Sequence, residues 1–187
     1  MPEVRFHGRG GQGAVMASRA LAEAAFLEGN HVQAFPAFGL ERRGAPVMAF
    51  TRIQDSPINN HSQIYRPDAV VVLDASLLVL VKVTDGLKEN GLILINTSQA
   101  PDEIVGMDGF RVAAVNAGAI AAKHGLGSRM SPIVNTAILG AVAGATGYVK
   151  LESVLKAIEN LVAIKPEKNI AACKEAFESV KCGGIFI

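Results

Sequence analysis

Four glycines close to the N-terminus form a motif that can bring backbone close to an anion. Gly8, Gly10 and Gly13 have G-x-G-x-x-G spacing, and Gly11 lies between them. The motif follows a short apolar run and precedes a helical pattern at residues 14–27. In that setting, glycines permit a tight strand-to-helix turn and let N–H groups reach a phosphate at the helix N-terminus. The spacing therefore favours an anion or coenzyme contact.

The same loop has features that a dinucleotide site does not require. Arg9 and Gln12 stand among its glycines, and the second strand, at residues 31–35, runs into Pro36. A NAD site uses an acid at the end of that strand, but no acid occurs from Gly29 through Leu40. A dinucleotide site, another anion contact and a turn packed on protein all remain open. The candidate cofactor contacts are Gly8, Arg9, Gly10, Gly11, Gln12 and Gly13.

A second loop carries two adjacent arginines. Glu41, Arg42 and Arg43 lie between glycines and prolines in the segment 36–46. Arginine binds phosphate or carboxylate through paired N–H donors, so these residues are further candidate contacts for a cofactor or partner. A pairing of Glu41 with an arginine that only holds the loop is the alternative. Because the loop follows the second strand, we expect it beside the glycine loop.

Four other polar residues are weaker candidates. We expect the His7 side chain to be hydrogen-bonded within the glycine loop. Asp74 and Asn116 each follow an apolar strand, where a helix cap is more common than a ligand contact. Asn135 lies in an apolar helical pattern, and a buried amide needs partners, so it marks either a packing contact or a subunit interface, of which we favour the interface. The sequence contains no pattern of a catalytic triad, paired catalytic carboxylates, a metal site or a Walker lysine, so no catalytic and no metal-binding residue is predicted.

The bulk properties limit the class of protein. A chain of 187 residues can form one domain, and we expect residues 1–187 to do so. A net charge of +1 gives no reason to expect nucleic acid or membrane partners. Cys173 and Cys182 do not have the spacing of a redox pair or an iron–sulfur site, so we expect free thiols in a cytoplasmic protein. The apolar run that starts at Ala69 is interrupted by charges, so no membrane span is predicted.

The elements that must position these residues mostly alternate between strand and helix. This order predicts an α/β, Rossmann-like domain with a largely parallel sheet flanked by helices. In the region 36–57, a hairpin or an antiparallel strand is expected instead of a helical crossover. The expected strands are 4–7, 31–35, 47–53, 69–73, 91–96 and 110–115. The expected helices are 14–27, 76–82, 116–124, 132–149, 151–161 and 166–180.

Small residues recur in the helical segment 132–149. Gly140, Gly144 and Gly147 leave room for a close neighbour, and we expect a second subunit to fill it. The apolar tail, residues 183–187, is expected to dock on this subunit or on a neighbour.

The two loop segments, 6–14 and 35–47, together resemble the gamma subunit of 2-oxoacid:ferredoxin oxidoreductases. The similarity continues through 63–68, 71–74 and the helix from Pro132 to Gly140, and so covers nearly the whole chain. The Glu-Arg-Arg-Gly-Ala-Pro form of the second loop is most similar to the pyruvate or branched-chain type.

This resemblance implies a role in an enzyme that decarboxylates a 2-oxoacid oxidatively, forms acyl-coenzyme A and reduces ferredoxin. It implies that thiamine diphosphate, magnesium and iron–sulfur clusters belong to the alpha, beta and delta subunits. This chain would then carry no cofactor of its own, would not be catalytic alone, and would help to form the coenzyme A cleft. A stand-alone nucleotide-binding oxidoreductase and a small-ligand-binding scaffold are the alternatives.

Overall fold

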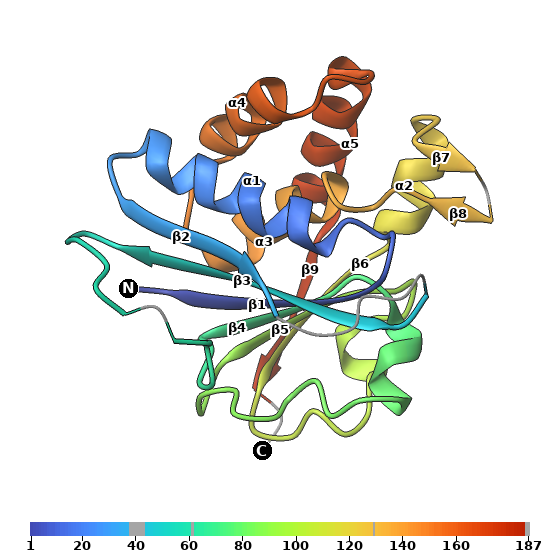
Figure 1. Ribbon diagram of the computed structural model, residues 1–187. Coiled ribbons are helices and arrows are strands. Elements are labelled where there is room, and N and C mark those ends of the chain that lie inside the picture. The colour runs from blue at the N-terminus through green and yellow to red at the C-terminus, as the bar shows by residue number, and fades with distance from the viewer. Residues whose placement is uncertain (38–43, 61, 129, 186–187) are drawn as a thin grey trace.

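A seven-stranded mixed sheet forms the centre of the protein (Figure 1). The computed structural model describes residues 1–37, 44–60, 62–128 and 130–185, with side chains up to residue 183. The strands follow each other across the sheet in the order β2-β3-β1-β4-β5-β6-β9. Their bounds are β1 Glu3–Arg9, β2 His31–Pro36, β3 Pro46–Gln54, β4 Ala69–Val72, β5 Leu92–Asn96, β6 Arg111–Val115 and β9 Lys181–Ile185.

The four central strands, β1, β4, β5 and β6, are parallel to one another. β4 and β5 are almost continuous runs of Val, Leu and Ile because both of their faces are buried. β3 instead pairs antiparallel with both β1 and β2. The predicted α/β class and the predicted antiparallel strand in the region 36–57 are therefore both confirmed.

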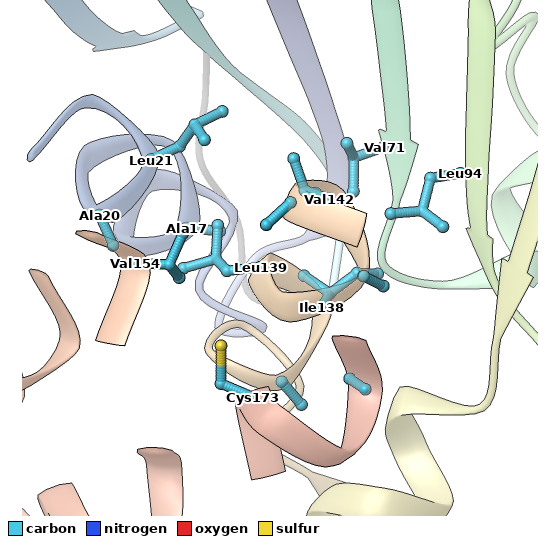
Figure 2. Close-up of a cluster of buried hydrophobic side chains, with 14 of the residues drawn as sticks. Ala17, Ala20, Leu21, Val71, Leu94, Ile138, Leu139, Val142, Val154 and Cys173 are labelled. Atoms are coloured by element: carbon cyan, nitrogen blue, oxygen red, sulfur yellow. The ribbon is translucent and has the colours of Figure 1, made fainter. Parts of the chain in front are cut away.

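Helices cover one face of the sheet, the upper face in Figure 1. Val71 and Leu94 of the sheet lie beside Ile138 and Val142 of α3 in the buried core (Figure 2). Alanines make up much of the helix surface that meets the strands, so the helices pack close to the sheet. The helices are α1 Ala14–Leu27, α2 Ala117–Lys123, α3 Ala137–Thr146, α4 Leu151–Leu161 and α5 Pro166–Ser179.

The opposite face is only partly covered. Under β4 to β6, a second apolar cluster joins Val70, Val72 and Ile93 to Leu77 and Ile104. Leu77 belongs to the short 3-10 helix η1 Ala75–Val79, and Ile104 directly follows the 3-10 helix η2 Pro101–Glu103. The part of the chain that contains η1 lies below the sheet in Figure 1. No helix among the described residues is long and apolar enough to cross a membrane.

The small residues of α3 serve packing within the chain. A Cβ at Gly140 would collide with the carbonyl oxygen of Cys173, and one at Gly144 would lie 3.0 Å from Val180 Cγ1. The neighbour that approaches α3 is therefore α5 of the same chain. The expectation that a second subunit fills this space was wrong. Helical glycines mark a close approach, but the sequence does not show which helix makes it.

Two element predictions need correction. The helix expected at 132–149 begins only at Ala137, because residues 131–132 form the strand β8 Ser131–Pro132 in a hairpin with β7 Gly127–Ser128. The segment expected as a helix at 76–82 contains a 3-10 turn only. Of the two alternatives for the tail, docking on its own subunit holds for the described part, since β9 pairs antiparallel with β6.

Both cysteines are free, as predicted. Cys173 is buried where α5 meets α3, and burial raises the pKa of its thiol to about 12. A thiol with such a pKa carries almost no thiolate at neutral pH, so Cys173 is a packing residue.

We predict that Gly140→Ala destabilises the protein by about 2–3 kcal/mol, because the added methyl must push α5 away from α3. Urea unfolding followed by circular dichroism measures the change. Gly118→Ala is the matched control, since its Cβ would meet nothing nearer than 3.7 Å, and its stability should stay within about 0.5 kcal/mol of the parent. Equal stability of the two variants would refute the role of Gly140 in helix packing.

Candidate functional site

The glycine loop joins β1 to α1 at the carboxyl end of the sheet. Gly11 and Gly13 have φ angles of 95° and 83°, which favour glycine. Gly13 is also the N-cap of α1, and a Cβ there would collide with the side-chain amide of Asn135. No side chain caps α1, and its first turn contains no acidic residue. The helix N-terminus therefore retains the partial positive charge that attracts anions.

The side chains of Arg9 and Gln12 converge on one carboxylate. Arg9 Nε donates to Asp74 Oδ2 at 3.0 Å, and Gln12 Nε2 donates to the same oxygen at 2.9 Å. The Oε1 atom of Gln12 accepts a hydrogen bond from the backbone N–H of Arg9 at 2.7 Å. Asp74 follows β4, so this cluster ties the glycine loop to the end of the neighbouring parallel strand.

Asp74 has the cap role that its position suggested. Its Oδ1 accepts from the N–H and the hydroxyl of Ser76 at the start of η1. Burial raises the pKa of the Asp74 carboxyl, but the hydrogen bonds from Ser76 and Gln12 and the charge of Arg9 outweigh it, so the net pKa is lowered. Asn116 is a cap as well, since its Oδ1 accepts from Ala119 N at the start of α2.

The second loop meets the first, as predicted. Gly10 N donates to the carbonyl of Ala45 at 2.9 Å, and Gly44 N donates to the carbonyl of Gly10 at 3.1 Å. Arg9 adds a third link through Nη1, which donates to the Gly44 carbonyl at 3.0 Å. Glu41, Arg42 and Arg43 themselves lie outside the described residues, and their role as contacts stays a prediction.

A cleft of about 420 Å³ opens at the carboxyl ends of β1, β4 and β5. Residues 10–12, Asp74 and Asn96 line one part of it, and residues 130–134 line another. Asn96 bridges two segments, because Nδ2 donates to the Leu73 carbonyl and Oδ1 accepts from Gly118 N. Asn96 was not among the predicted site residues. It is the last residue of the apolar strand β5, and this position, similar to those of Asp74 and Asn116 just after their strands, could have indicated it.

Asn135 has a different role from the one expected. It precedes α3, packs against Gly13, and accepts a hydrogen bond from Thr136 N at 2.9 Å. The packing contact, which was the alternative to an interface, is thus present within the chain, and the subunit interface at this amide stays a prediction.

His7 is hydrogen-bonded to a strand residue and not within the glycine loop as expected. Arg5 Nε donates to His7 Nε2 at 2.9 Å. His7 is only 5% exposed, and burial, together with the charge of Arg5, lowers its pKa to about 3. The imidazole is therefore neutral at physiological pH.

Two features of the described residues bear on which cofactors this site could hold. Among the described residues, no group of three or more His, Cys, Asp and Glu side chains could hold a metal ion. β2, whose end would carry the ribose-binding acid, is separated from β1 by the antiparallel β3. Asp74 does lie beside β1, but Arg9, Gln12 and Ser76 already bind its oxygens. The structure is thus a Rossmann-like domain whose glycine loop is held by contacts with Asp74 and the second loop.

Comparison with known proteins identifies the family. A model of the pyruvate ferredoxin/flavodoxin oxidoreductase family matches residues 3–179. The common gamma subunit of the pyruvate/ketoisovalerate oxidoreductases of Pyrococcus abyssi is 55% identical, over 97% of this chain and 98% of that one. Pyruvate synthase subunit PorC of Methanothermobacter marburgensis is 49% identical, over 98% and 100% of the two chains.

A solved structure agrees with the sequence relatives. The crystal structure of the Thermotoga maritima pyruvate oxidoreductase subunit PORC has a TM-score of 0.83 at 39% identity, and the match covers 97% of this chain and 98% of that one. The chain belongs to the pyruvate ferredoxin/flavodoxin oxidoreductase family, as a subunit of the gamma type. The predicted resemblance and the predicted fold are confirmed.

We predict that Asp74→Asn lowers the free energy of unfolding by about 1–2 kcal/mol, because an amide N–H group would face the donors of Arg9 or Gln12. Urea titration gives the difference. Asp108→Asn, at an exposed position outside this cluster, serves as the control and should change stability little. An Asp74→Asn protein as stable as the control would show that the cluster does not brace the loop.

We predict that acid destabilises the protein through His7. The unfolded imidazole gains a proton below about pH 6.5, whereas the folded one does so only near pH 3, so stability falls as the pH decreases across this window. Between pH 6.5 and 5 the loss should be about 1.5 kcal/mol, measured by urea unfolding at each pH. His7→Gln should remove this slope and His31→Gln, at an exposed position, should keep it; identical slopes in all three proteins would exclude His7 as the cause.

Proposed function

We propose that this chain assembles with alpha, beta and delta subunits into a 2-oxoacid:ferredoxin oxidoreductase, in which its glycine-loop face borders the coenzyme A site. The whole of residues 1–187 would act as one gamma-type domain. The names of the relatives, which are gamma or PorC subunits, support the assembly. The contact between the two loop motifs at the carboxyl ends of β1 and β4 is the observation that supports placing coenzyme A at this face.

The chemistry of the site suits the phosphates of coenzyme A. This ligand carries a diphosphate and a 3′-phosphate, so it needs several fixed hydrogen-bond donors. The uncapped N-terminus of α1 offers backbone N–H groups, and Gly11 and Gly13 let a phosphate approach it closely. Arg9 Nε and Gln12 Nε2 already donate hydrogen bonds to Asp74, so the role of both side chains is to hold the glycine loop in place. The arginine donors for phosphate would then be Arg42 and Arg43.

The other cofactors of such an enzyme would be held by the partner subunits. Thiamine diphosphate with magnesium, and the iron–sulfur clusters, supply the carbanion chemistry and the electron transfer of the reaction. The described part of this chain offers no set of side chains that fits a metal ion or a cluster. The task of this chain is therefore to bind and orient coenzyme A at the inter-subunit cleft. A reducing cytoplasm would suit its free Cys173 and Cys182.

We predict that Arg42→Ala or Arg43→Ala, in the assembled enzyme, raises the Michaelis constant for coenzyme A about tenfold. A lost charge-assisted hydrogen bond costs about 1.5–3 kcal/mol, and about 1.4 kcal/mol corresponds to a factor of ten. The Michaelis constant for the 2-oxoacid should change little, since that substrate binds elsewhere. Steady-state kinetics with each substrate varied in turn measure both constants.

Arg19→Ala is the matched control, because Arg19 is exposed on α1 and belongs to neither loop motif. Size-exclusion chromatography reports assembly for each variant. If Arg42 and Arg43 variants assemble normally and keep their coenzyme A kinetics, the proposed cleft is wrong. If they fail to assemble while the residual complex has normal coenzyme A kinetics, the arginines bind a partner subunit and not coenzyme A.

A further inference from the structure

A second cavity, of about 520 Å³, lies under β1 and β3 on the sheet face opposite α1. Phe6 points toward α1, so Arg5 and His7, its neighbours in the strand, point to the other face. The apolar cluster under β4 to β6 does not include this region. None of the residues that line the glycine-loop cleft lines this cavity, so the two are separate sites.

One wall of the cavity carries a hydrogen-bond donor of fixed orientation. His7 Nε2 accepts from Arg5 Nε, so the hydrogen-bond network assigns the proton of the neutral ring to Nδ1. Within the described part of the chain, no group accepts a hydrogen bond from Nδ1, and no buried side-chain nitrogen or oxygen there lacks a partner. Nδ1 is therefore in contact with the cavity and not enclosed in protein. A pKa of about 3 keeps this N–H present at any physiological pH.

Arg5 fixes the histidine and adds positive charge. Its Nη2 donates to the carbonyls of Val83 and Asp85 at 2.8 and 2.6 Å, so the segment 83–85 holds the guanidinium in place. Lys82 and the carboxylate of Asp85 stand among the other lining residues. Two cations and one anion leave a net charge of +1 on these three side chains, which favours an anionic ligand.

Most of the remaining lining residues are apolar, and Gln63 is a further polar one. Met48, Phe50, Ile64 and Val81 line the interior, and Tyr65, which is 70% exposed, lies at its opening. The volume is in the range of about 300–1,000 Å³ that is usual for small-molecule sites and exceeds that of a single side chain. A ligand that fits must combine an apolar body with one acceptor group, since His7 offers one N–H.

We propose that this cavity binds a small monocarboxylic acid with an apolar body, whose carboxylate accepts a hydrogen bond from His7 Nδ1 and lies near Lys82. Binding is non-covalent and independent of the proposed coenzyme A site. Phe50, Met48 and Ile64 surround the apolar part.

The probe for this proposal is benzoate, with benzyl alcohol as its uncharged counterpart of similar shape. Purified full-length chain, labelled with ¹⁵N in histidine, is titrated with each compound while the ring N–H resonances are followed. We expect benzoate to shift the His7 Nδ1–H signal saturably and benzyl alcohol to bind about tenfold more weakly. Absence of a saturable shift at His7 up to millimolar benzoate would overturn the proposal.

Two surface variants test the contacts without disturbing the fold. Lys82→Ala should weaken benzoate binding by about two- to fivefold, as the loss of one exposed charge allows, and should leave benzyl alcohol binding unchanged. Lys174→Ala, at an exposed position on α5, is the charge-matched control and should not alter either affinity. If Lys82→Ala and Lys174→Ala bind benzoate equally, or if benzoate and benzyl alcohol bind equally, the site does not recognise a carboxylate and the proposal fails.

Discussion

The carboxylate of Asp74 is the interaction on which the geometry of the glycine-loop face depends. It receives Arg9 and Gln12 on one oxygen and Ser76 on the other, so a single side chain joins the end of β1, the end of β4 and the start of η1. Arg9 extends the connection to the second loop through the Gly44 carbonyl. Arg9, which the sequence suggested as a cofactor contact, thus stabilises the positions of the two loops. Arg9 and Gln12 therefore leave the backbone N–H groups at the start of α1 as the donors of this loop that are free of side-chain caps.

Close packing of small residues sets the other constraint. Gly13 makes room for Asn135, and Gly140 makes room for the backbone of α5 at Cys173. These contacts bring α3 and α5 down onto the sheet and fix the segment 130–136 beside the glycine loop, where it forms part of the cleft. In a core so rich in alanine and glycine, stability depends on how closely the backbones approach one another, because each side chain contributes little apolar area.

The two faces of the sheet have different chemical characters. Alternation along β1 sends Val4 and Phe6 into the helical core and turns Arg5 and His7 to the opposite face. On that face the buried polar side chains satisfy each other and leave one imidazole N–H directed at a cavity. The glycine-loop cleft, by contrast, is built from loop backbone at the carboxyl ends of the strands. The two cavities of this domain therefore differ in the chemistry of the groups that line them.

The sequence alone determined the α/β class, most strand positions, the antiparallel strand after the second loop, the caps at Asp74 and Asn116, and the family. The family follows from the resemblance of the two loop segments, and the other features follow from local patterns, because apolar periodicity, glycine spacing and cap residues act over a few neighbours. Only the tertiary structure decided that Arg9 and Gln12 bind Asp74, that Arg5 holds His7, and that α5 is the neighbour of Gly140. It also decided that Pro132 ends a hairpin strand and that Asn135 packs on the glycine loop. Each of these contacts depends on a partner far away in the chain. The type of a residue shows that it requires a donor, an acceptor or space, but it does not show which distant group provides it.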